Sequence, residues 1–200
     1  MNNIFTRIKY FLVLVLLSSI GIFDTYGQYC TPQYLFDCEG PDALNPGPTA
    51  DYINNFSTSQ GVTNITNNNS GCSANNYNYY SSQTVSAAQG CSFNVSMQCN
   101  SQFAQGFRIW IDWNQDGIFQ DPAERVYSSP ASGIVVYNGT VQVPSTALLG
   151  VTRMRVRSSF AAIPASPCNL PTGLEVGEAE DYNLEGIAAT DATIDVSDVT

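Results

Sequence analysis

The chain has 200 residues, with 17 acidic and 7 basic side chains and no histidine, which gives a formal net charge of −10 at pH 7. This acidic balance disfavours binding to nucleic acid or to anionic membranes, because both attract basic surfaces. The lack of histidine excludes a Ser–His–Asp triad, a Cys–His pair and a His-Glu-x-x-His zinc site. The hydrophobic fraction of 44% and the aromatic fraction of 12% are enough for the core of one β-rich domain.

Residues 1–27 have the pattern of a secretory signal peptide. Arg7 and Lys9 precede an apolar run over 10–23, which is short for a membrane span, and small residues precede the expected cleavage site. An anchor helix that is not cleaved is the alternative. We therefore expect a secreted protein, located outside the cell or on its surface, with no stable membrane insertion after cleavage.

The six cysteines all follow this segment, and an even number in a secreted chain predicts three disulfides. A zinc site is the alternative, but the chain has no Cys-x-x-Cys spacing. Cys91 and Cys99 lie on one predicted strand, about 26 Å apart if it is straight, so they should not bond to each other. Each is expected to reach a neighbouring element. The pairing among the cysteines stays open; they are Cys30, Cys38, Cys72, Cys91, Cys99 and Cys168.

Many short strands separated by turns predict an all-β fold, an antiparallel β-sandwich with a jelly-roll or immunoglobulin-like arrangement and no helices beyond the signal peptide. The turn at Gln89-Gly90 predicts a hairpin between its two flanking strands. We expect one domain over 28–185 and a polar linker or tail over 186–200. The expected strands cover 51–56, 61–66, 83–88, 91–99, 107–113, 125–127, 133–143, 151–160 and 174–184.

The central strand over 107–113 runs directly into an acidic loop. Asp112, Asn114 and Asp116 alternate, and a glycine follows. Oxygen side chains at every second position can converge on one hard cation, and this pattern commonly adds the carbonyl of the residue that Ile118 occupies here. The loop therefore predicts a calcium site. An acidic turn without an ion is the alternative.

The remaining calcium ligands must come from elsewhere, because Ala123 stands where an EF-hand has its bidentate glutamate. Glu124 and Asp121 follow in the same loop. Glu180 and Asp181, in the last predicted strand, are the distant candidates, and they would tie the central strand to the terminal one.

The last strand and the strand over 151–160 carry complementary charges. Alternation places Glu178 and Glu180 on the same side as Tyr182, and if that side is the core, two carboxylates point toward an apolar interior. Buried carboxylates need partners. Two sets of partners are possible, a row of arginines or a cation shared with the Asp112 loop; the arginines are Arg153, Arg155 and Arg157.

A carboxylate pair of the glycosidase type is the one catalytic arrangement left open, formed by Glu178 with Glu180 or by either with Asp112. Acids that bind calcium or face arginine stay ionised and are poor general acids. We therefore expect no catalysis.

Aromatic side chains offer a sugar-binding alternative. Tyr77, Tyr79 and Tyr80, together with Trp110, could form a stacking platform for carbohydrate. The other interpretation is that the tyrosines are ordinary strand residues at a sheet edge.

Five segments in order resemble the GEVED domain, a module of secreted bacterial proteins, from about Tyr29 to Leu184. The resemblance implies an accessory β-sandwich module, found beside secreted proteases and surface adhesins, with no established catalysis of its own. It favours a non-catalytic interaction module whose partner is an extracellular protein or a polysaccharide. Ala179 stands where the family motif has valine. The segments are YCTP at 29–32, SGCS at 70–73, WIDWNQDG at 110–117, RMRVR at 153–157 and GEAEDY at 177–182.

Overall fold

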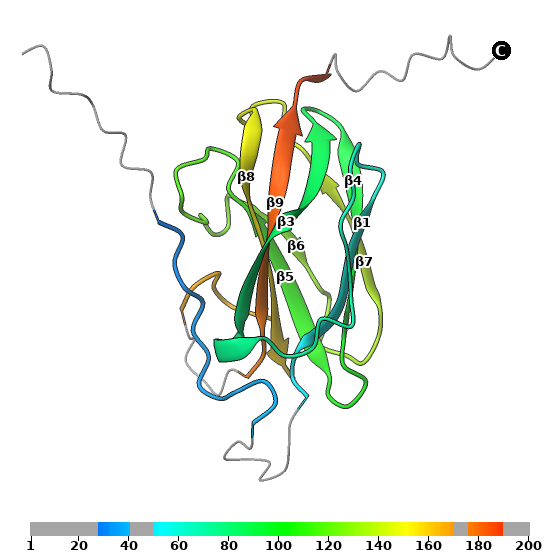
Figure 1. The fold of residues 1–200 in the computed structure, drawn as a ribbon, viewed down its shortest axis with the longest axis vertical. Helices are drawn as coiled ribbons and strands as arrows, with labels where there is room; N and C mark the ends of the chain where they lie inside the picture. Colours follow the sequence, from blue (N-terminus) through cyan, green and yellow to red (C-terminus); the bar gives the residue numbers. More distant parts are fainter. Residues whose placement is uncertain (1–27, 41–49, 170–175, 190–200) are drawn as a thin grey trace, which may run out of the picture.

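The computed structural model describes residues 28–40, 50–169 and 176–189. The predicted signal peptide and most of the predicted tail lie outside these residues. Two β-sheets face each other and enclose one hydrophobic core (Figure 1). Within the described residues, no helix is long and apolar enough to cross a membrane.

The four-stranded sheet has the order β2-β1-β4-β7, and its neighbouring strands are antiparallel. Inward side chains of β4 alternate with outward ones, as predicted, so that Phe93, Val95 and Met97 are buried. The strands are β1 (Ile53–Ser59), β2 (Thr66–Asn68), β4 (Ser92–Cys99) and β7 (Tyr137–Gln142).

The five-stranded sheet has the order β3-β9-β8-β5-β6. Its neighbours are antiparallel except β3 and β9, which run parallel. Ala74–Asn76 forms a short 3₁₀ turn, and the described residues contain no α-helix, so the all-β sandwich prediction is confirmed. The strands are β3 (Tyr77–Ala88), β5 (Gln105–Ile111), β6 (Arg125–Ser128), β8 (Gly150–Phe160) and β9 (Ala179–Ile187).

The predicted hairpin around Gln89-Gly90 is wrong. The turn forms, with Gly90 at a φ of +76° and the amide of Cys91 bonded to the carbonyl of Ala88 at 3.0 Å. However, β3 joins the five-stranded sheet and β4 the four-stranded one. The turn is therefore a bridge between the two layers. Both strands present apolar residues to the same core, so alternation alone does not reveal that they belong to different sheets.

Two disulfides form instead of the three expected. Cys30 bonds to Cys168 and Cys38 to Cys72, with Cα–Cα distances of 5.8 and 5.7 Å. Cys91 and Cys99 are both free, so they do not bond to each other, as predicted, but neither bonds to another element. The physical reason is their position, because Cys99 is buried at the end of β4 and Cys91 is exposed just before it.

Candidate functional site

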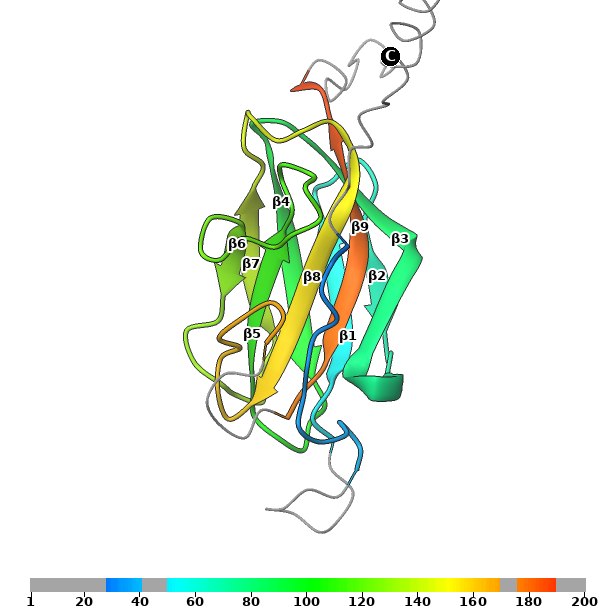
Figure 2. The same ribbon diagram turned by 90° about the vertical axis from the view of Figure 1, so that its left-hand side faces the viewer.

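The arginine row lies on the outer face of the five-stranded sheet. Arg153, Arg155 and Arg157 alternate along β8 with Met154 and Val156, which are buried in the core. Residues 28–40, called here the N-terminal strap, cross this outer face in front of β8 and β9 (Figure 2). The strap explains why two of the three guanidinium groups are buried although they point away from the core.

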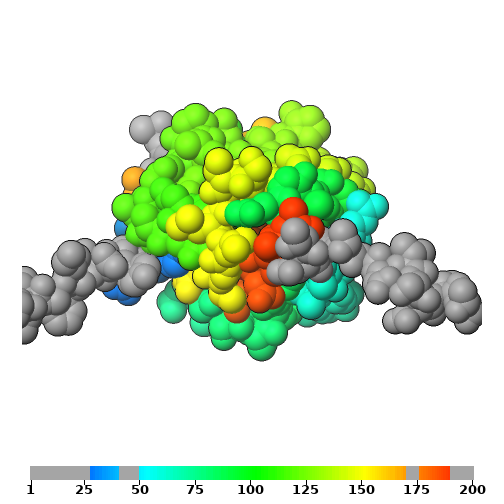
Figure 3. Space-filling model, turned by 90° about the horizontal axis from the view of Figure 1, so that it is seen from above, coloured from blue at the N-terminus to red at the C-terminus, as the bar shows by residue number. Residues whose placement is uncertain are grey.

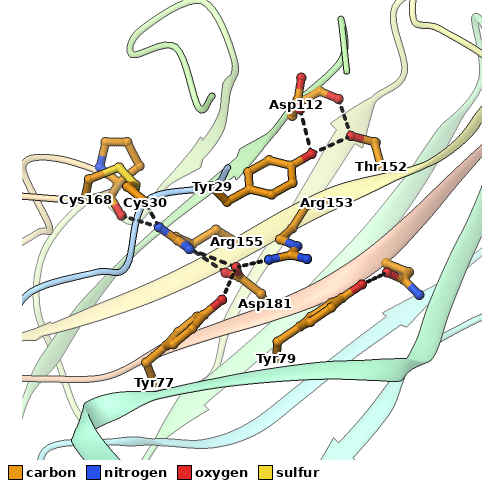
Figure 4. A network of polar contacts seen from close by, with 12 residues as sticks. Tyr29, Cys30, Tyr77, Tyr79, Asp112, Thr152, Arg153, Arg155, Cys168 and Asp181 are labelled. Carbon is orange, nitrogen blue, oxygen red and sulfur yellow. Dashed lines mark hydrogen bonds and ion pairs between the residues drawn. A yellow bond between two sulfur atoms is a disulfide. The ribbon is translucent and has the colours of Figure 1, made fainter. Parts of the chain in front are cut away.

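Asp181 is the partner of the central arginine. Arg155 donates from Nε to Oδ1 at 2.7 Å and from Nη2 to Oδ2 at 2.8 Å, and both side chains are fully buried (Figure 4). Arg153 lies 3.5 Å from the same carboxylate, and the Tyr77 hydroxyl donates to it at 2.8 Å. Burial and the neighbouring Asp181 raise the pKa of Tyr77 to about 12. Two cations and a phenol thus compensate one buried carboxylate.

Aromatic rings stack on the arginines from both sides. The guanidinium of Arg153 lies 3.7 Å from the ring centroid of Tyr79 and 4.5 Å from that of Tyr29 (Figure 4). Arg157 lies 4.5 Å from the ring of Tyr34. Cation–π contacts of this kind are worth about 0.5–1 kcal/mol when exposed and more when desolvated. The strap tyrosines therefore fix the strap to β8.

The same cluster holds the strap covalently and through its carbonyl groups. Cys30, next to Tyr29, bonds to Cys168, and Arg155 Nη1 donates to the carbonyl of Pro167 at 3.0 Å. Arg157 Nη2 donates to the strap carbonyl of Gln33 at 2.6 Å. These contacts join the strap, the segment around Cys168 and β8 into one unit.

Glu178 and Glu180 point inward, as the alternation predicts, but neither bonds to the arginine row. Glu178 accepts hydrogen bonds from the backbone amides of Ile53 at 3.0 Å and Ser73 at 2.7 Å. Glu180 accepts from the hydroxyl of Tyr182 and lies 3.4 Å from the amide nitrogen of Asn67. Both carboxylates therefore connect the terminal segment to residues of the opposite sheet or the loop beside it.

Burial raises the pKa of both carboxylates. The pKa of Glu178 rises to about 7, although the two backbone amides oppose the shift. The pKa of Glu180 rises to about 8, first through burial and then through the neighbouring Glu178 charge. Raised pKa values also occur in general acids, but these two side chains are fully buried, so a polymeric substrate cannot reach them.

The acidic loop closes on itself through its carboxylates. The buried Asp112 accepts from the backbone amides of Asp116 at 3.2 Å and Gly117 at 2.9 Å. Glu124 accepts from the amides of Trp113 and Gln120, each at 2.9 Å. The loop is thus pre-shaped by the side chains predicted to bind calcium.

The strap also contacts this loop. The hydroxyl of Tyr29 donates to Asp112 Oδ2 at 2.6 Å (Figure 4). The ring centroid of Tyr29 lies 5.0 Å from that of Phe119. Phe119 in turn lies 4.8 Å from the guanidinium of Arg155. One ring of the strap therefore bridges the acidic loop and the arginine row.

The predicted calcium ligands fall into separate groups. Five of them share the acidic loop, whereas Asp181 faces Arg155 outside the sheet and Glu180 points into the sandwich. Across the described residues, the carboxylates of the loop do not gather within 4.8 Å of one another as a group of three. The loop residues are Asp112, Asn114, Asp116 and Ile118, with Glu124 closing the loop at its far end.

The aromatic platform proposed for sugars does not form. Trp110 is fully buried and donates from Nε1 to Asp121 at 3.0 Å. Tyr79 covers Arg153, and Tyr80 stacks on Tyr182 with ring centroids 5.4 Å apart. Trp110 alternates with the core residues Ile109 and Ile111 and therefore faces outward from the sheet, where other segments bury it.

These features define a class of protein, a disulfide-bonded β-sandwich whose acidic last strand is joined to an arginine-bearing neighbour by a buried ion pair beneath a strap. Residues 106–185 match the family model of the GEVED domain. No curated protein matches the chain. The match contains three of the five segments that carry the resemblance, at 110–117, 153–157 and 177–182, and confirms the resemblance over this part of the chain.

Proposed function

We propose that this chain is a non-catalytic extracellular interaction module, held together by its disulfides and by calcium. One observation carries the proposal. The acidic side chains of the terminal strand are each engaged inside the fold, Asp181 by Arg155 and Glu178 by backbone amides. They act as internal fasteners between segments, and this supports a stable scaffold for binding.

The geometry argues against a glycosidase. A general acid and a nucleophile or base must flank the bond that is cleaved, with both carboxyl groups open to substrate. Glu178 and Glu180 are buried inside the sandwich, and Asp112 is buried beneath the strap tyrosine. We expect the secreted protein to hydrolyse neither peptides nor glycosides. Turnover that disappears in Glu180→Gln would refute this.

Calcium is proposed at the acidic loop alone. Asp112, Asn114 and Asp116 would supply side-chain oxygens, Ile118 its carbonyl, and Glu124 the closing carboxylate. Supporting this, the backbone amides four and five residues after Asp112 already bond to its carboxylate and curve the loop around it. Asp116 is partly exposed, and its carboxylate accepts a hydrogen bond from the side-chain amide of Asn114. A small side-chain rotation would let this carboxylate bind an ion instead.

Thermal melting tests the calcium proposal. At ~1 mM calcium, a site with a dissociation constant of ~0.1 mM adds about 1.4 kcal/mol to the free energy of unfolding. The melting temperature of a domain of this size should rise by a few degrees relative to chelator.

Two variants sharpen the test. Asp116→Ala should abolish the calcium-induced shift, whereas Glu39→Gln, on the exposed strap, should keep it. A wild-type melting temperature that does not respond to calcium would show that the loop is an acidic turn without a bound ion. A shift that survives Asp116→Ala would place the ion elsewhere.

A further inference from the structure

The outer face of the four-stranded sheet carries uncharged polar side chains in register. Thr66 of β2 pairs with Ser57 of β1, Ser57 with Ser96 of β4, and Ser96 with Asn138 of β7. The row crosses all four strands. Its members are serine, threonine or asparagine, and each is partly or fully exposed.

A second row repeats the pattern two residues along the strands. Ser59 pairs with Asn94, and Asn94 pairs with Thr140. A shallow hollow of about 460 Å³ lies over the two rows where β1, β4 and β7 meet. This volume is within the range of ligand sites, roughly 300–1,000 Å³.

Much of the hydrogen-bonding capacity of this face is unused. Thr140 donates to Asn94 at 2.9 Å. Within the part of the chain that the structure describes, the side chains of Ser57, Ser59, Ser96 and Asn138 have no such partner. Hydroxyl and amide groups are therefore free to bond to a ligand.

This is also the open face of the sandwich. The strap covers the outer face of the other sheet, and it lies on the opposite side of the molecule from β1, β4 and β7 (Figure 1). A ligand that lies flat on a sheet would therefore meet the four-stranded sheet.

The chemistry of the face selects its occupant. Anionic polymers need Lys or Arg, and metal ions need carboxylates, and the two rows offer neither. Protein interfaces centre on aromatic, Met or Arg anchors, which the rows also lack. Hydroxyl and amide groups suit a partner that is itself uncharged and rich in hydroxyls.

We propose that the face formed by β1, β4 and β7 binds a neutral polysaccharide, whose chain lies across the two rows. The inference rests on the proposed role as an interaction module and names its partner class. Because no aromatic ring stacks on the sugar here, single-site affinity is weak, and retention depends on repeated contacts along the polymer.

Affinity electrophoresis of the full-length secreted protein tests this surface. The gels contain hydroxyethylcellulose, barley β-glucan or dextran, with alginate and polygalacturonate as acidic counterparts. At least one neutral polymer should retard the protein. Ser96→Arg at the centre of the row should weaken this retardation about tenfold, as should Asn138→Arg. Ser82→Arg, on an exposed part of β3, is the matched control and should change nothing.

The outcomes separate this inference from the proposed function. Retardation by acidic polymers only, or equal retardation of wild type and Ser96→Arg, would overturn the glycan face. No retardation by any neutral polymer would also overturn it, and the scaffold role tested by calcium melting would remain. Cleavage of a bound polymer would overturn the non-catalytic role, while loss of retardation in Ser96→Arg would still support the face.

Discussion

Replacing Arg155 with alanine tests the central claim that the buried ion pair fastens the terminal strand. Arg155 makes two hydrogen bonds to Asp181, at 2.7 and 2.8 Å, and one to the carbonyl of Pro167, and it is fully buried. Removing it leaves Asp181 buried with part of its compensation gone. We expect a large loss in the free energy of unfolding.

The magnitude follows from what remains around Asp181. Breaking a buried ion pair costs about 3–5 kcal/mol when the surviving charge has no partner. Here Arg153 at 3.5 Å and the hydroxyl of Tyr77 at 2.8 Å still face the carboxylate. The loss should therefore be near the low end, about 3 kcal/mol, or about 6–12 °C in melting temperature.

Urea unfolding followed by circular dichroism measures this effect, with the second ion pair as an internal control. Arg125 lies 3.1 Å from Asp121, but both side chains are more than a quarter exposed. Exposed pairs contribute about 0–1 kcal/mol, so Arg125→Ala should cost less than 1 kcal/mol.

A double replacement separates charge from packing. Arg155→Met with Asp181→Leu removes both charges and keeps apolar volume, so it should cost less than the two single replacements together. The reasoning is refuted if Arg155→Ala costs no more than Arg125→Ala, or if the double replacement is fully additive.

Three further outcomes follow from buried groups and close contacts. The folded-state pKa of Glu180, about 8, lies above its unfolded value of 4.5, so its protonated form stabilises the fold below pH 4.5 and this stability is lost as pH rises through 8. Urea titrations at pH 5 and 8.5 should show the loss, and Glu180→Gln should reduce it. A maleimide should label native Cys91 but not the buried Cys99, whose thiol has a raised pKa; unreactive thiols after denaturation would indicate a third disulfide. Gly106→Ala should destabilise by about 1–3 kcal/mol, because its Cβ would lie 2.3 Å from the carbonyl oxygen of Ala162; a neutral result in urea would contradict this contact.

The sequence was sufficient to predict the class of fold and which side chains of a strand share one face. Period-two alternation correctly placed Glu178 and Glu180 on the same side of their strand as Tyr182, and this side is buried. Alternation is a local property and survives in any sheet, which is why these assignments hold. Sheet membership is not local, so the turn at Gln89-Gly90 gave the wrong pairing.

The partners of the charged residues were harder to infer. Because side chains alternate along a strand, Asp181 points to the opposite side of the sheet from Glu180. This is the side of the arginine row, so the pairing of Asp181 with an arginine could have been inferred from the sequence. The partners of Glu178 are backbone amides of Ile53 and Ser73, more than a hundred residues away, and no side-chain pattern points to them. The burial of Trp110 depends on covering segments for the same reason.

The residues that carry the family resemblance lie apart from the surfaces that are open to a partner. Four of the five segments that carry the resemblance meet in one network, through Tyr29, Asp112, Arg153 and Asp181 (Figure 4). Their shared task is to hold the strap, the acidic loop and the terminal strand together. The segments that carry the family resemblance therefore serve to fasten the scaffold.

The proposed partner would then bind to surfaces that this network leaves open. One is the end of the sandwich where β8 begins and β9 ends side by side (Figure 3). The other is the outer face of β1, β4 and β7, and the first two of these strands lie outside the matched residues 106–185. Substitutions on that face leave the fastening intact, so the same scaffold can carry different binding surfaces. This is the physical reason to test the polar rows first.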